Sequence, residues 1–90
     1  MELDQAVGTT LRILRKRKGL TQEQLALEAG AERNYISLIE LGRNSPSVRM
    51  LYRLCSVLDL PPSELLAQVE VLTAQKQNVK KPSRANVSSI

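Results

Sequence analysis

The feature that most constrains this chain is the stretch "GLTQEQLALEAGAERNYISLIELG", residues 19–42. Thr21 and Gln24 have the spacing of a capping box, in which each side chain bonds to the other residue's backbone N–H at the start of a helix. Apolar residues then recur at helical spacing until Gly30 stops the pattern. A second helical pattern follows after only three residues and also stops at a glycine. We therefore expect two short helices joined by a tight turn.

The remaining sequence also follows a helical period, without the sustained alternation that is typical of strands. Pro62 suits the first turn of a helix, because its missing N–H would have no helical partner there. The expected helices cover about residues 4–18, a second from Thr21 to Gly30, a third over 33–41, a fourth that starts near Pro46 and carries Val48 to Leu58, and a fifth over 62–75. These segments predict an all-α fold, a compact five-helix domain over residues 1–75 with a basic, flexible tail over 76–90.

The net charge of +4 comes from the tail. All nine acidic residues lie within residues 1–70, where nine of the 13 basic residues balance them. The excess is contributed by Lys76, Lys80, Lys81 and Arg84. A basic tail attracts any polyanion, whether nucleic acid or an anionic membrane, so the charge alone does not identify a partner.

The composition excludes several functions. The chain has no histidine and a single cysteine, Cys55, so a zinc site, a histidine-based catalytic group and an intrachain disulfide are not expected. We expect no metal, no cofactor and no enzymatic activity. No apolar run approaches the roughly 18 residues of a membrane span, and no signal peptide is visible. The expected location is the cytoplasm, in association with the nucleoid.

At about 100° per residue, the helix expected over 33–41 has two different faces. One face is expected to pack inward and holds Tyr35, Ile36, Ile39 and Glu40. The other projects outward and holds Arg33, Asn34, Ser37, Leu38 and Leu41. Arginine can donate two hydrogen bonds to guanine, and asparagine can pair with adenine. The two short helices therefore predict a helix-turn-helix that reads double-stranded DNA, although a solvated face of an arbitrary five-helix bundle remains an alternative.

The segment from "GLTQEQLALEAG" through "NYISLIELGRNSPS" to the leucine-rich fourth helix resembles the lambda repressor/Cro-like helix-turn-helix family of bacterial and phage transcription regulators. The resemblance covers about residues 7–66. Within this family, "R.YIS.IE" is similar to the controller proteins of restriction-modification systems. The resemblance implies a lambda-repressor-like fold with its helix-turn-helix at helices two and three. It also implies sequence-specific DNA binding by a repressor or an autoregulatory controller.

The resemblance also implies roles for individual residues. In the family pattern, the glutamate at position 40 pairs with an arginine of the first helix, which here is Arg15, and this ion pair holds the first helix against the third. Glu32 departs from the pattern, and it either accepts from a cytosine amino group or acts as a mild repulsive filter. The base-reading positions are Arg33, Asn34, Ser37 and Leu38, the last through a thymine methyl group. The backbone-contacting positions are Gln22, which also braces the third helix, and Arg43, Asn44 and Ser45.

Surplus apolar residues predict a homodimer on an inverted-repeat operator, because one short helix reads only a few base pairs. The expected interface is formed by the end of the fourth helix and by the fifth helix. It comprises Val57, Leu66, Val69, Val71 and Leu72. These residues could instead complete the core of the monomer. A second functional hypothesis is an antitoxin-type interaction module that binds its own promoter and uses its tail to hold a protein partner.

Overall fold

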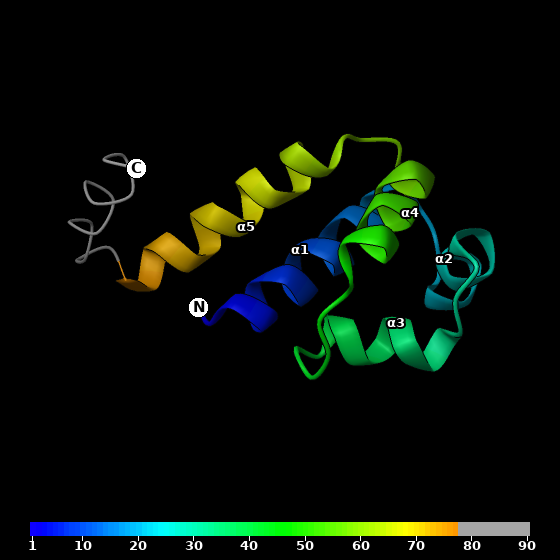
Figure 1. The fold of residues 1–90 in the computed structure, drawn as a ribbon, viewed down its shortest axis with the longest axis horizontal. Coiled ribbons are helices and arrows are strands. Elements are labelled where there is room, and N and C mark those ends of the chain that lie inside the picture. Colours follow the sequence, from blue (N-terminus) through cyan, green and yellow to red (C-terminus); the bar gives the residue numbers. More distant parts are fainter. Residues whose placement is uncertain (78–90) are drawn as a thin grey trace.

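The computed structural model describes the backbone of residues 1–77 and the side chains of residues 1–74. Within this range the chain forms five helices and no strand, which confirms the all-α prediction (Figure 1). The fifth helix continues two residues beyond the expected boundary at 75, and the rest of the predicted tail lies outside the described residues. The helices are α1 (Leu3–Arg17), α2 (Gln22–Ala29), α3 (Arg33–Glu40), α4 (Val48–Leu58) and α5 (Pro62–Gln77).

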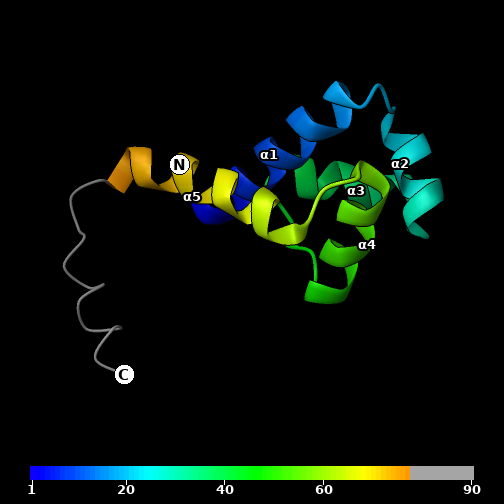
Figure 2. The same ribbon diagram turned by 90° about the horizontal axis from the view of Figure 1, so that it is seen from above.

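The helices form a long pair at one end and a group of shorter helices at the other. α5 lies alongside α1 and runs in roughly the opposite direction (Figures 1 and 2). The amino group of Met1 donates to the carbonyl oxygen of Leu72 at 3.3 Å, which fastens the start of the chain to α5. α2 packs on α3 and α4, and α3 also packs on α1. This arrangement leaves α3 along one edge of the molecule (Figure 1).

The core draws on all five helices. Its largest side chains with almost no exposed surface are Leu11, Leu25, Ile36, Ile39, Leu54 and Leu65. Val69 also belongs to this core, with 2% of its surface exposed. The prediction that Val69 lies in a dimer interface is therefore wrong, because its side chain completes the monomer core. Val57 and Leu72 are partly buried against the core, and Leu66 remains 44% exposed.

Gly8 allows α1 and α3 to approach each other at backbone distance. A Cβ atom at position 8 would lie 2.1 Å from the carbonyl oxygen of Ile39 and 2.8 Å from that of Glu40. Real Cβ atoms essentially never lie that close to another heavy atom. The crossing of α1 over the end of α3 therefore requires glycine at this position, a requirement that no local sequence pattern indicates.

The predicted capping box at the start of α2 is confirmed. The Thr21 Oγ1 atom accepts from the Gln24 backbone N–H at 3.0 Å, and the Gln24 side-chain oxygen accepts from the Thr21 N–H at 2.9 Å. Gly30 ends α2 in the left-handed conformation at φ 74°, which most other residues adopt only with strain. α2 and α3 are thereby held at a defined angle by a three-residue turn.

Candidate nucleic-acid interface

The outer face of α3 is accessible, as the sequence predicted. Arg33 and Asn34 are exposed at the first turn, whereas Ser37 and Leu38 are half-buried further along the helix. On the opposite side, Ile36 has no exposed surface, like Ile39 one turn later. α3 therefore presents a guanidinium and a carboxamide to solvent from a helix whose other face is fixed in the core.

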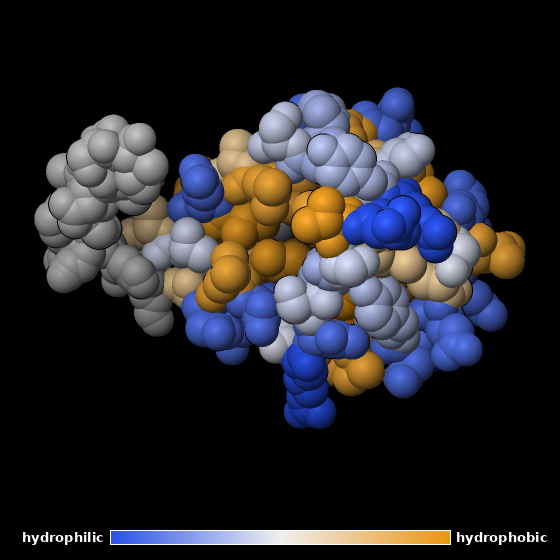
Figure 3. Space-filling model, viewed as in Figure 1, coloured by the Kyte–Doolittle hydropathy of each residue, from blue (hydrophilic) through white to orange (hydrophobic). Residues whose placement is uncertain are grey.

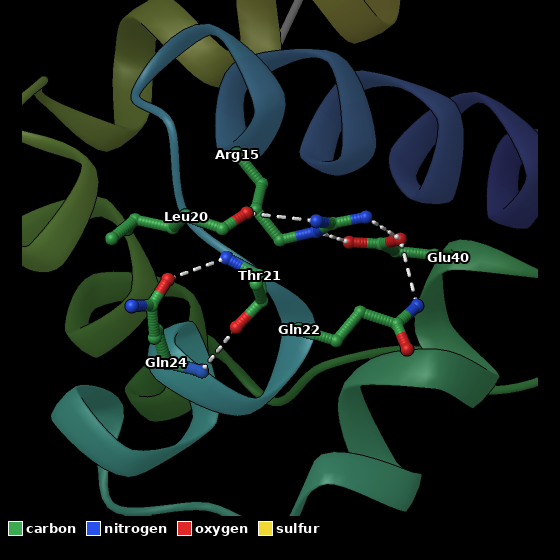
Figure 4. A network of polar contacts seen from close by, with 6 residues as sticks. All are labelled: Arg15, Leu20, Thr21, Gln22, Gln24 and Glu40. Atoms are coloured by element: carbon green, nitrogen blue, oxygen red, sulfur yellow. Dashed lines mark hydrogen bonds and ion pairs between the residues drawn. The ribbon is translucent and has the colours of Figure 1, made fainter.

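Glu40 and Arg15 form the ion pair that the family resemblance implied (Figure 4). Arg15 Nε donates to Glu40 Oε2 at 2.6 Å, and Arg15 Nη2 donates to Glu40 Oε1 at 2.9 Å. Only 8% of the arginine side chain and 4% of the glutamate side chain are exposed. Hydrogen bonding to the Glu40 side chain raises the pKa of Arg15, against the opposing effect of burial. The pair is charged and holds α1 to the end of α3.

The same network extends to α2 (Figure 4). Arg15 Nη1 donates to the carbonyl oxygen of Leu20 at 2.9 Å, just before α2. Gln22 Nε2 donates to Glu40 Oε1 at 3.0 Å, so that one carboxylate receives groups from both α1 and α2. The three helices are thus held by one polar cluster, defined here as the Arg15–Gln22–Glu40 clamp.

Gln22 was predicted to brace the third helix and to contact a phosphate. The hydrogen bond to Glu40 accounts for the bracing. A carboxamide nitrogen carries two N–H donors, so one donor stays free after the bond to Glu40 is made. The phosphate contact remains a prediction that this geometry allows.

A shallow hollow lies beside the clamp, between the end of α1, the start of α2 and Arg33 of α3. Lys16 and Arg33 contribute positive charge to its lining, and Glu23 contributes one negative charge. The N–H groups of the first turn of a helix and its dipole favour an anion at this kind of place. The hollow is lined by Arg15, Lys16, Gly19, Leu20, Thr21, Gln22, Glu23 and Arg33.

The loop after α3 carries the other predicted backbone contacts. Arg43 and Ser45 are exposed, and Asn44 is half-buried. The Asn44 Oδ1 atom accepts from the Ser45 backbone N–H at 2.9 Å, so this side chain shapes the loop. The Asn44 amide nitrogen remains available as a donor because only the oxygen is used in that bond.

Glu32 is the residue directly before α3. It is exposed, and its side chain makes no capping hydrogen bond to the helix. Its carboxylate is therefore free to face a ligand beside Arg33.

In the described part of the chain, no group of three histidine, cysteine, aspartate or glutamate side chains could hold a metal ion. None of the described helices has the length and apolar character to cross a membrane. Cys55 is a free, fully buried thiol, and its burial raises its pKa.

A capped α2, a three-residue turn and an exposed α3 held on a core of five helices define a helix-turn-helix protein. The model of the helix-turn-helix family matches residues 11–65, and this chain belongs to that family. The relationship inferred from the sequence motifs is thereby confirmed.

Three similar proteins illustrate the match. The uncharacterized HTH-type transcriptional regulator y4dJ of Sinorhizobium fredii is 36% identical over 70 residues, which cover 78% of this chain and 91% of that protein. The clp gene regulator ClgR from Corynebacterium glutamicum has a TM-score of 0.81 and 27% identity, with 99% of this chain and 95% of that chain covered. The restriction-modification controller protein C.AhdI from Aeromonas hydrophila has a TM-score of 0.67 and 39% identity, with 69% and 94% covered.

Proposed function

We propose that this chain is a sequence-specific transcription regulator that binds double-stranded DNA through α3. The observation that carries the proposal is the exposure of Arg33 and Asn34 on a helix whose opposite face carries the fully buried Ile36 and Ile39. The names of similar proteins, which are transcription regulators, support the same function. The Arg15–Gln22–Glu40 clamp holds α3 in a fixed orientation in the free protein. Little conformational entropy is therefore lost when α3 binds DNA.

In this proposal α3 enters the major groove with its first turn leading. Arg33 donates to a guanine and Asn34 pairs with an adenine, which are the contacts that those side chains make best with base edges. Ser37 and Leu38 follow on the same side of the helix, where Leu38 reaches a thymine methyl group. Glu32 lies at the edge of the site. Its carboxylate either accepts a hydrogen bond from a cytosine amino group or acts as a mild repulsive filter against other sequences.

Phosphates on either side of the groove hold the helix in register. One phosphate lies at the hollow beside α2, where Gln22 supplies its second amide N–H and Lys16 adds charge. A second lies at the loop after α3, within reach of Arg43, Asn44 and Ser45. These contacts carry no sequence information, but they set the depth and angle of α3.

We propose that the active species is a homodimer on an inverted repeat. Apolar side chains gather between α5 and α1 on the face shown in Figure 3. Leu66 is 44% exposed, and Val57 and Leu72 are only partly buried, so these residues can contact a second copy. Two copies would present two α3 helices to successive major grooves, about 34 Å apart. Such a dimer acts in the cytoplasm as a repressor or as a controller of its own gene.

The test is selection of bound duplexes from a random-sequence library. We expect enrichment of an inverted repeat whose half-sites are about 10 base pairs apart. Footprinting upstream of the protein's own gene then tests for autoregulation. The Arg33→Ala variant should lose the enrichment, while Arg12→Ala removes the same charge from an exposed position of α1 and should keep it. Failure of the wild-type protein to enrich any sequence would refute the proposal.

A further inference from the structure

The outer face of α4 carries exposed apolar and basic side chains that the proposed DNA contacts do not use. Val48 is 71% exposed and Tyr52, one turn later, is 60% exposed. Arg49 and Arg53 are exposed beside them, and the four residues line a shallow hollow. Dark blue and orange side chains lie next to one another over α4 in Figure 3. We call these four residues the α4 face.

The outer face of α2 has the opposite charge. Leu27 is 80% exposed, more than any other large apolar side chain in the described part of the chain. Glu23 lies one turn before it and Glu28 directly after it, and both are exposed. We call these three residues the α2 face. Each of the two faces has an apolar centre, and each places its charged side chains within one turn of that centre.

None of these four charged side chains forms an ion pair with another described residue. The ion pairs of the described residues are Arg15–Glu40 and Lys18–Asp59, so the charges of the α2 and α4 faces have no partner there. Within one chain, Arg53 Nη1 lies 3.8 Å from the position that a Cβ atom of Gly30 would take at the end of α2. No ion pair joins it to Glu23 or Glu28. α2 and α4 pack on each other through their buried sides, so Leu27 can reach the hollow between Val48 and Tyr52 only from a second copy.

We propose that the α2 face of one copy docks on the α4 face of another. Leu27 enters the hollow between Val48 and Tyr52, and the carboxylates meet the arginines around it. The contact is heterologous, since each copy offers a different face, and it therefore continues from copy to copy instead of closing on itself. It is distinct from the proposed dimer surface, whose residues lie on α5 and on another side of α4.

The contact is small, so we expect it to be weak between free molecules and effective between neighbours on DNA. Interfaces below about 1,200 Å² are typical of transient encounters. Binding two copies side by side raises their effective concentration and strengthens such a contact without new interactions. Only this consequence depends on the proposed DNA binding. The contact itself is a property of the free protein.

Two variants separate the faces. Leu27→Gln with Glu28→Lys breaks the α2 face, and Tyr52→Gln with Arg53→Glu breaks the α4 face. All four positions are exposed, so both variants should keep the fold, which is checked by thermal unfolding. The α2-broken variant is labelled with ¹⁵N and observed by NMR at about 1 mM, a concentration suited to a weak contact.

The labelled variant alone should show no concentration-dependent shifts on α4, because its sample contains no intact α2 face. Addition of the unlabelled α4-broken variant, which has an intact α2 face, should shift the amide signals around Val48 and Tyr52. The matched control is an unlabelled chain with both faces broken, which should shift none of them. The design holds whether or not the chains also dimerise through α5. Exchange of subunits between such dimers does not restore an α2 face to the labelled chain.

Three results would overturn the proposal. The first is absence of α4 shifts on addition of the intact α2 face, and the second is equal shifts with the control chain. The third is a shift of the α4 amides on addition of a random-sequence duplex but not of the intact α2 face, which would make this face a DNA contact. Because the first two measurements contain no DNA, their failure leaves the proposed DNA binding untouched.

Discussion

The guanidinium of Arg15 meets the carboxylate of Glu40 at two points, with donor–acceptor distances of 2.6 and 2.9 Å. The two residues belong to α1 and α3, and both side chains are more than nine-tenths buried. A charge buried in this way is stabilised by its partner and is costly without it. The pair therefore holds α3 in place against α1.

Replacement of Glu40 by alanine should destabilise the fold by about 3 to 5 kcal/mol, because it leaves the Arg15 charge buried and unpaired. The measurement is urea unfolding followed by circular dichroism. Glu64→Ala, which removes an exposed carboxylate, should change stability by less than about 0.5 kcal/mol. A Glu40→Ala protein that unfolds like wild type but no longer discriminates between DNA sequences would contradict the structural role of the pair.

Replacement of Gly8 by alanine should destabilise the protein by about 3 kcal/mol or more, because the new Cβ would overlap the Ile39 carbonyl oxygen and force α1 away from α3. Gly19→Ala is the matched comparison. Gly19 has a positive φ of 78° but no atom within 4 Å of its Cβ position, so only backbone strain of about 1 kcal/mol is expected there. Equal losses of stability in the two variants would argue against the close approach of α1 and α3.

Replacement of Thr10 by valine should stabilise the protein. Its hydroxyl is buried and has no hydrogen-bond partner in the structure, and 1% of the residue is exposed. An isosteric apolar side chain removes the cost of burying that group, so we expect Thr10→Val to raise the free energy of unfolding by about 1 kcal/mol. Thr21→Val should act in the opposite direction by a similar amount, since it removes the cap of α2. A Thr10→Val protein less stable than wild type would show that the hydroxyl is satisfied.

Binding to DNA should weaken steeply with salt. If about 6 to 10 phosphates are neutralised, affinity should fall roughly 10³- to 10⁵-fold between 50 and 200 mM salt. Fluorescence anisotropy with a labelled duplex measures this dependence. Arg43→Ala should reduce the steepness of the slope of log affinity against log salt by about one, which is the contribution of one phosphate contact. A slope that is unchanged in this variant would remove Arg43 from the backbone contacts.

Local signals allowed much of the fold to be predicted. The capping box at Thr21 and the stop at Gly30 depend on residues within one or two turns, so the start and end of α2 could be inferred from neighbours in the sequence. The separation of the α3 faces follows from helical periodicity in the same way. Ser47 caps α4 by accepting from the Met50 N–H at 3.1 Å, and a serine just before an apolar helical pattern is a local signal of the same kind.

Contacts between distant segments could not be inferred from such patterns. The role of Gly8 depends on where α1 crosses α3, and no local rule gives that position. Periodicity showed that Val69 is part of an apolar stripe, but it did not show whether α1 or a second copy covers that stripe. The Arg15–Glu40 pair was inferred from resemblance to a family, because the spacing alone does not identify partners on different helices.

We propose that the first turn of α3 reads bases, and a comparison of Arg33→Ala with wild type on two duplexes tests this most directly. One duplex carries the selected inverted repeat and the other a scrambled sequence of equal length, at the same salt concentration. We expect a loss of about 1 to 3 kcal/mol in binding free energy on the selected site and a much smaller loss on the scrambled one. Equal losses on both duplexes, or no loss on either, would contradict it.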